Sequence, residues 1–288
     1  MPLAVIEFDF DPVLRLGAGI AVRWQTVALA GVVAVALVIA AVIGRRRGLR
    51  ADDLLYIAIG IVPGAVVAGR LGYGLLHADV FGADPRALLD PSRGGLELGL
   101  GVAGGALSGA YVAALLGAPV GRWAHAAAFP MLLGIAFGKF SMILGGSGQG
   151  LPTDASWATS FAGPGPWGSL APSLPSHPAQ AYEGLAALGI LVVLAVVVAA
   201  GGFARRDGRL LLVAIAEWAL ARAAVSLVWR EPPIIGPMNA GGLIAAGVAL
   251  VTVCVITVMT VRSRGPVNET AVPAAEPAWP DPAARPRF

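Results

Sequence analysis

Seven long apolar stretches constrain the fold of this 288-residue chain more than any other feature of its sequence. An α-helix needs about 20 predominantly apolar residues to cross a bilayer, and each stretch is long enough. Inside a membrane every backbone polar group must find a partner within the protein, which favours helices. We therefore predict an all-α protein with seven transmembrane helices. The expected spans are residues 18–43, 53–77, 95–117, 123–144, 180–201, 209–229 and 238–261.

The composition excludes most other classes of protein. Charged residues make up 13% of the chain, whereas a soluble domain has about 25%. No arginine-rich helix or basic patch with interleaved aromatic residues points to nucleic acid, so we expect no nucleic-acid partner. No spacing typical of metal ligands is visible, and we expect no metal and no cofactor.

The distribution of basic residues predicts the orientation in the membrane. If the N-terminus lies outside, the inner loops and the C-terminal segment hold 12 lysines and arginines, and the outer segments hold four. Inner loops of membrane proteins carry the excess of such residues. We therefore expect the N-terminus outside and the C-terminus in the cytoplasm.

Two segments fall outside the spans. Residues 145–178 are rich in glycine, proline and serine and contain no basic residue, so they are expected to form an outer loop. Residues 264–288 are rich in proline and alanine, which predicts a disordered cytoplasmic tail after a membrane domain of residues 1–263.

Several ionisable residues lie within the spans, where a charge is costly and usually functional. Lys139, the only lysine of the chain, and Arg222 both lie toward the outer half of their spans. Two cations in one outer cavity without matching acids would bind an anion such as a phospholipid headgroup. In the alternative interpretation Lys139 pairs with an acid of a neighbouring span, for example Glu97 or Glu217.

Three stretches resemble one bacterial enzyme family. GKFSMILGGSGQGLPT (residues 138–153) aligns without a gap to the motif Gly-Arg-x-Gly-Asn-x-x-Asn-Gly-Glu-x-x-Gly-Arg-Pro-Thr, and HPAQAYEGL (residues 177–185) to His-Pro-Ser-Gln-Leu-Tyr-Glu. AGRLGYG within residues 53–77 is similar to Gly-Ala-Arg-Leu-Gly-Tyr. The family is prolipoprotein diacylglyceryl transferase, and the resemblance extends over residues 8–261.

The resemblance implies a function and a set of site residues. The enzyme would sit in the bacterial plasma membrane as a multi-pass protein, with phosphatidylglycerol and lipoprotein precursors carrying a lipobox cysteine as its partners. It would transfer a diacylglyceryl group to that cysteine and form a thioether. The expected catalytic residues are Lys139, Arg222, Glu183 and His177. The expected headgroup-binding residues are Arg70, Lys139, Gly150, Arg222 and Arg230.

The chain also departs from the family at named positions. Lys139 stands in place of an arginine, and Gly99 lies near the position of a proposed histidine base. The remaining departures are Gln25 for tyrosine, Met142 and Gly145 for asparagine, Ser147 and Ser226 for glutamate, and Leu151 for arginine. Two further hypotheses therefore stay open. One is a transferase-like lipid-binding or assembly protein without this chemistry, and the other is a transporter with a broken helix around residues 145–150.

Overall fold

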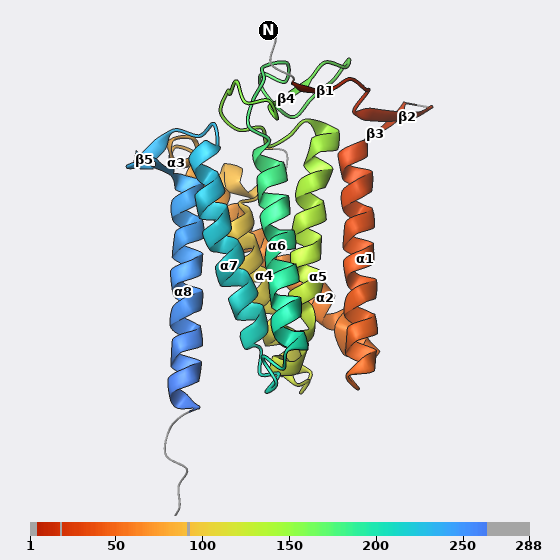
Figure 1. Cartoon of the computed structure of the whole chain (residues 1–288), viewed down its shortest axis with the longest axis vertical. Coiled ribbons are helices and arrows are strands. Elements are labelled where there is room, and N and C mark those ends of the chain that lie inside the picture. The colour runs from red at the N-terminus through yellow and green to blue at the C-terminus, as the bar shows by residue number, and fades with distance from the viewer. Residues whose placement is uncertain (1–4, 18, 91–92, 264–288) are drawn as a thin grey trace, which may run out of the picture.

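The computed structural model describes residues 5–17, 19–90 and 93–263 of the chain. Within these residues seven helices are long and apolar enough to cross a membrane, which confirms the predicted fold class. They are α1 (Trp24–Arg46), α2 (Ala51–Leu76), α4 (Leu98–Leu115), α5 (Val120–Ser141), α6 (Ala179–Ala199), α7 (Arg209–Val225) and α8 (Ala240–Arg262). Figure 1 shows them side by side as one bundle. The tail that we predict to be disordered lies outside the described residues.

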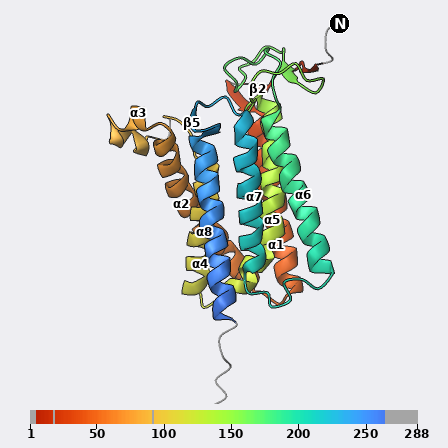
Figure 2. The same cartoon turned by 60° about the vertical axis from the view of Figure 1, so that its left-hand side comes forward.

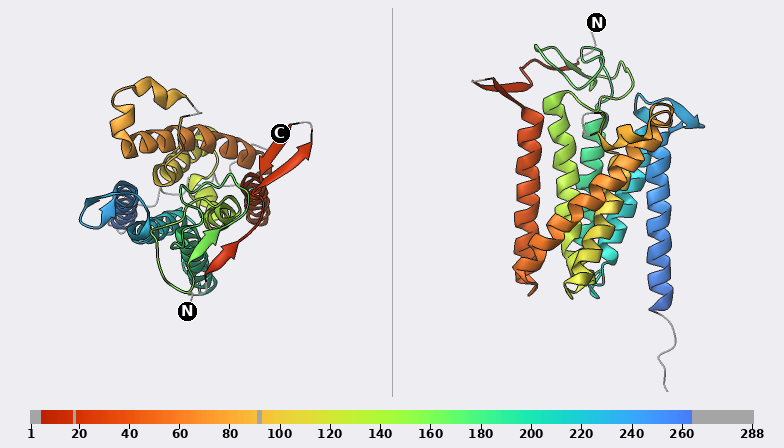
Figure 3. Two further views of the ribbon diagram at one scale, coloured as in Figure 1. Left: turned by 90° about the horizontal axis from the view of Figure 1, so that it is seen from above. Right: turned by 180° about the vertical axis from the view of Figure 1, so that it is seen from behind.

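Most of the irregular structure lies at one end of the bundle, here called the head end, where α1, α6 and α8 begin (Figures 1 and 3). Three two-stranded sheets lie there: β1 (Ile6–Phe8) with β4 (Thr159–Phe161), β2 (Val13–Gly17) with β3 (Ile20–Arg23), and β5 (Pro233–Ile235) with β6 (Met238–Asn239). The short helices are α3 (Ala78–Phe81), η1 (Pro85–Leu89), η2 (Met142–Gly145) and η3 (Ser226–Val228). The opposite end, where α8 ends, is called the tail end.

The first predicted span began too early. Residues 20–23 form strand β3, and α1 begins only at Trp24. Gly17 and Gly19 have φ angles of +83° and +79°, a backbone that favours glycine and lets the chain reverse into a hairpin. The hairpin carries exposed apolar side chains such as Leu16, which is why the apolar run extended beyond the helix. The other six predicted spans agree with the helices to within a few residues.

Helices α2 and α4 pack with their backbones in close contact. A Cβ atom on Gly104 would lie 2.4 Å from the carbonyl oxygen of Gly64, so neither position has room for a side chain. Small residues allow such close approach of membrane helices. α2 crosses the bundle diagonally (Figure 3, right), and toward the head end it leans away from α7 and α8 (Figure 2). Its Gly72 contacts the side chain of Glu97, just before α4.

Helices α5 to α8 share the main hydrophobic core. Trp218 of α7 is fully buried between α5, α6 and α8 together with Leu132, Ala187 and Val248. Lipid tails give no hydrophobic drive for helix association, so this tight packing supplies much of the attraction between the helices. The core fixes the rotation of α5, α6 and α7, and with it the direction of their charged residues.

Candidate active site

Four charged residues from four helices meet near the head end. Glu97 is the N-cap of α4, and Lys139 lies in the last turn of α5. Glu183 follows the first turn of α6, and Arg222 lies in the last turn of α7. Successive spans run in opposite directions, so the start of α4 and α6 and the end of α5 and α7 lie at the same end (Figure 1). We call these four residues the charge cluster.

The carboxylate of Glu183 is the centre of the cluster. Its Oε2 lies 2.9 Å from Lys139 Nζ, and Arg222 Nη1 donates to both of its oxygens at 2.9 and 3.0 Å. Arg222 Nη2 donates to Glu97 Oε1 at 3.2 Å. The side chains of Glu183 and Glu97 are 1% and 0% exposed, against 13% for Lys139. Two cations thus face two carboxylates, and Lys139 is the member most open to solvent.

The expectation of two cations without matching acids is therefore wrong, because α4 and α6 each supply a carboxylate. Lys139 does pair with an acid, as the alternative interpretation required, but the acid is Glu183. Glu217 has no hydrogen bond or ion pair among the described residues. It lies on the same side of α7 as Leu220, whose side chain is 56% exposed. Glu217 is therefore not the acid that pairs with Lys139.

The backbone of α4 holds Glu97 in place. Glu97 Oε1 accepts a hydrogen bond from the Gly99 N–H at 2.8 Å, and Oε2 accepts one from the Leu100 N–H at 2.6 Å. A carboxylate at this position satisfies free amides of the first turn and interacts favourably with the helix dipole. A Cβ atom on Gly99 would lie 3.2 Å from both carboxylate oxygens. Glu97 therefore occupies the space that a larger side chain at position 99 would use.

The cluster keeps hydrogen-bond donors that no described residue uses. Arg222 Nε is buried and has no partner within the described part of the chain. The guanidinium lies over the ring of Trp229, with its carbon 4.5 Å from the ring centroid. Lys139 has three N–H donors, and its one ion pair is with Glu183. The Lys139 ammonium therefore offers free donors to an oxyanion at the head end, and the buried Arg222 adds its positive charge.

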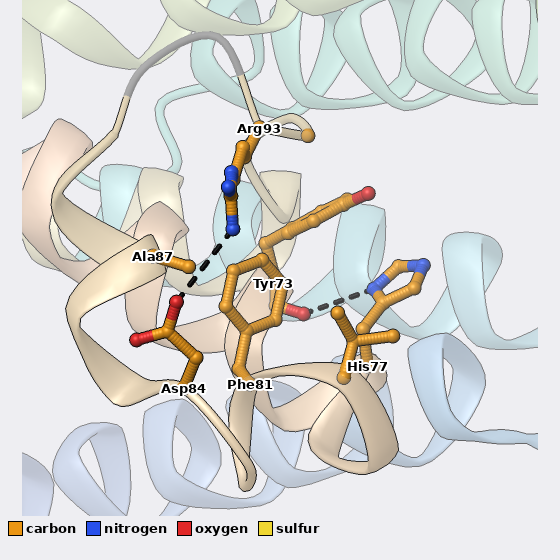
Figure 4. A pocket seen from close by; sticks show the side chains of 8 residues that line it. Tyr73, His77, Phe81, Asp84, Ala87 and Arg93 are labelled. Atoms are coloured by element: carbon orange, nitrogen blue, oxygen red, sulfur yellow. Dashed lines mark hydrogen bonds and ion pairs between the residues drawn. The ribbon is translucent and has the colours of Figure 1, made fainter.

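Arg70 lies apart from the charge cluster. Its guanidinium donates to backbone carbonyls of the segment between α2 and α4, and these interactions occupy its donors. The acceptors are the carbonyl oxygens of Ala87, Leu88, Asp90, Arg93 and Gly95. The same segment lines a cavity of about 250 Å³ with Tyr73, His77 and Phe81 (Figure 4). The geometry gives Arg70 a structural role, and its binding of a headgroup stays a prediction.

Arg230 and Gly150 join the outer loop to the end of α7. Arg230 Nε donates to the Gly150 carbonyl at 2.6 Å, and its other nitrogens donate to the hydroxyls of Ser169 and Ser176. A Cβ atom on Gly150 would lie 2.4 Å from the carbonyl oxygen of Val228, so only glycine fits. Both residues hold the loop over the head end.

His177 belongs to a separate polar contact in the same loop. Its Nδ1 lies 3.1 Å from the hydroxyl of Tyr182, and that hydroxyl accepts a hydrogen bond from Trp157 Nε1 at 2.7 Å. None of these contacts includes a member of the charge cluster. Of the predicted catalytic residues, the structure brings Lys139, Glu183 and Arg222 together and leaves His177 outside their contacts.

Comparison with known proteins decides the family. The family model described as prolipoprotein diacylglyceryl transferase matches residues 12–259, which include six whole spans and all but the last three residues of α8. The chain belongs to this family. It is similar to the phosphatidylglycerol–prolipoprotein diacylglyceryl transferase of Rhodopseudomonas palustris, with 29% identity over 96% of the chain and 100% of the relative. It is also similar to the enzyme of that name from Geobacter sulfurreducens, with 30% identity over 89% of the chain and 98% of the relative.

Three departures from the prolipoprotein diacylglyceryl transferase motif lie in contact with one another. Ser147 Oγ donates to Gln25 Oε1 at 3.1 Å. A Cβ atom on Gly145 would lie 2.0 Å from the same Gln25 oxygen, so the glycine makes room for the glutamine. Gln25 is far from Gly145 and Ser147 in the sequence, but it contacts both at the head end. The replacements at these three positions therefore fit one another.

Sequence reasoning missed Glu231, which follows Arg230 in the loop after α7. Glu231 is an exposed residue, but partial desolvation of its carboxyl raises the pKa, although Arg222, His77 and the Gly241 N–H act in the opposite direction. A carboxyl with a raised pKa beside a cationic cluster is a candidate for proton transfer. The only sequence signal was its position directly after Arg230, just beyond the sixth predicted span.

The raised pKa of Glu231 predicts a pH-dependent stability. Its carboxyl holds a proton more tightly in the folded state than in the unfolded state, so its ionisation destabilises the fold as the pH rises. Glu231→Gln should therefore match wild type below about pH 4, near the unfolded pKa, and unfold at a higher temperature than wild type at neutral pH. Unfolding midpoints in detergent measured against pH would show this, with the exposed Glu7→Gln as the control. A difference that stays constant across the pH range would contradict it.

Proposed function

We propose that this chain is a phosphatidylglycerol–prolipoprotein diacylglyceryl transferase that modifies the lipobox cysteine of lipoprotein precursors. The observation that supports this most is the charge cluster, where Lys139 and Arg222 keep free donors beside buried carboxylates. The cluster lies where the headgroup layer of a membrane would meet the ends of the spans. A negatively charged headgroup is the substrate part that such donors would bind.

The reaction makes one bond and breaks one bond. The thiolate of the precursor cysteine is the reactive form of the thiol. It attacks the carbon of the diacylglycerol unit that is bonded to a phosphate oxygen. A C–S bond forms, the C–O bond to the phosphate breaks, and glycerol phosphate leaves with the bonding electrons. Negative charge develops on that oxygen, and cations aimed at it stabilise the transition state. Lys139 and Arg222 take this role.

The thiol proton needs an acceptor, and the chain offers three. Glu183 accepts hydrogen bonds from both cations, which favours its ionised form and weakens it as a base. His177 is tied to Tyr182 in the outer loop. Glu231 lies close enough to Arg222 for the two charges to interact. We rank Glu231 beside His177 and ahead of Glu183 for this step.

The substrates require the head end to face outward in the bacterial plasma membrane, as the arginine distribution predicts. Alkaline phosphatase, which is active only after export, should therefore be inactive when fused after Arg264. The same enzyme inserted after Leu170, a fully exposed residue of the outer loop, should be active and serves as the matched control. Activity of the fusion after Arg264 would show that the protein has the opposite orientation. The charge cluster would then lie at the inner leaflet, which would contradict the proposal.

Complementation tests the proposed transfer directly. Expression of this chain in a bacterium with a conditional transferase deletion should restore growth and the lipid-modified form of a reporter lipoprotein. Arg222→Gln is the negative control. Failure to restore growth by a protein that is inserted and stable would favour a lipid-binding or assembly role without this chemistry.

A further inference from the structure

A second group of polar residues lies at the tail end, far from the charge cluster. Arg47 follows the last turn of α1, His125 lies in the second turn of α5, and Arg206 lies between α6 and α7. We call these three residues the tail-end cluster. His125 is 2% exposed, and its Nδ1 has no hydrogen-bond partner in the described ranges of the chain. Arg47 Nη1 is likewise buried without a partner there.

The charges of the tail-end cluster are not balanced. Burial lowers the pKa of Arg47, and the nearby Arg206 guanidinium lowers it further. Asp207 is the one acid whose charge acts on His125 among the described residues. Its carboxylate is engaged by Arg209, through Nε at 3.4 Å and the backbone N–H at 3.3 Å. Positive charge and unused donors therefore remain, in contrast to the paired charges at the head end.

Close backbone packing fixes the position of the cluster. A Cβ atom on Gly121 would lie 2.8 Å from the backbone of Asp207, so the loop before α7 rests directly on the first turn of α5. Arg122 donates to the carbonyl oxygen of Arg47 and joins α1 to α5. It also lines a cavity of about 190 Å³ with Arg50 and Asp53. The Gly121–Asp207 contact and the Arg122–Arg47 hydrogen bond thus hold the basic groups together before any ligand arrives.

We propose that the tail-end cluster binds a phosphate group. Guanidinium groups match phosphate oxygens in charge and in planar geometry, and a neutral imidazole can donate the further hydrogen bond. Basic pockets between helix ends at a membrane surface bind anionic headgroups. The ligand is either the headgroup of an anionic lipid in the tail-end leaflet or a phosphate in solution. This site is independent of the proposed transfer reaction.

Thermal unfolding of the purified full chain in an uncharged detergent tests the proposal. Phosphatidic acid, an anionic lipid without the glycerol headgroup of the proposed substrate, should raise the unfolding midpoint by mass action. Phosphatidylcholine should not. Arg47→Gln and Arg206→Gln should each weaken the apparent affinity about tenfold, because each removes a charged hydrogen bond. Arg205→Gln, a change at the neighbouring exposed arginine, should leave the affinity unchanged.

Two further arms identify the source of the phosphate and separate the two ends. If inorganic phosphate at matched ionic strength gives the same Arg47-dependent rise, the ligand is a soluble anion. Lys139→Ala should keep the part of the effect that depends on Arg47 and Arg206, since it alters only the head end. Arg206 is exposed, so Arg206→Gln should fold even if Arg47→Gln does not. No rise with either probe, or a rise in Arg206→Gln with the same dependence on probe concentration as in wild type, would overturn the proposal.

Discussion

Arg222→Gln should lower the free energy of unfolding by about 3–5 kcal/mol, because it removes the partner of two buried carboxylates. The substitution should also reduce transfer at least a hundredfold, which corresponds to about 3 kcal/mol of lost transition-state stabilisation. Arg222 bonds to both Glu183 and Glu97, and it is the one cation of the cluster with two carboxylate partners among the described residues. Thermal unfolding in detergent and transfer of labelled lipid to a precursor peptide measure the two effects.

Two matched variants make this result interpretable. Arg23→Gln removes an exposed arginine at the same end of the bundle, and it should change the midpoint very little. The double change Arg222→Gln/Glu183→Gln restores equal numbers of positive and negative groups, so its loss should be smaller than that of Arg222→Gln alone. A double variant as unstable as the sum of its single changes would show that the charges do not act on one another.

Lys139→Ala should lower stability less than Arg222→Gln, but it should abolish the response to phosphatidylglycerol that remains in an Arg206→Gln background, where the tail-end cluster is weakened. Glu183 keeps Arg222 as a partner when Lys139 is lost, so the expected cost is about 1–3 kcal/mol. Lys139 is the most accessible member of the cluster, and we expect phosphatidylglycerol to raise the wild-type midpoint through it. Lys139→Arg should retain or improve binding and transfer, because guanidinium offers two parallel hydrogen bonds to a phosphate.

The two roles of Lys139 separate in one experiment. If Lys139→Ala, in the Arg206→Gln background, lowers the midpoint without lipid yet keeps the full rise with phosphatidylglycerol, the lysine is only a partner of Glu183. Glu217→Gln is the control within a span. Glu217 has no hydrogen bond or ion pair in the described part of the chain, so this variant should leave lipid binding and transfer unchanged.

The sequence was sufficient for the number and position of the spans, because apolar length alone decides which segments can cross a membrane. It was not sufficient for the start of α1, because apolar residues such as Leu16 and Ile20 occur in a hairpin as well as in a helix. Three of the four members of the predicted catalytic set meet in space, because their positions at span ends and the alternating direction of the helices place them at one end.

The pairing within the cluster could not be predicted from the sequence. Whether Lys139 faces Glu97, Glu183 or Glu217 depends on how each helix is rotated about its axis, and the packing around Trp218 sets that rotation. Spans that are apolar on all sides carry no periodic signal for it. The contacts of Arg70 could not be predicted for a related reason, because its acceptors are loop carbonyls and any sequence provides those.

The charge cluster also has a consequence for the biogenesis of the protein. Its four members enter the bilayer on four separate helices, α4 to α7, and each charge costs about 3 kcal/mol while it is alone in lipid. Glu97 and Lys139 arrive first, but Glu183 and Arg222 are needed before every charge has its partner. A chain truncated after α5 or α6 would therefore keep uncompensated charges in the membrane. Such fragments should be preferred targets for membrane proteases. The ion pairs that form the site therefore also distinguish the complete bundle from a truncated one.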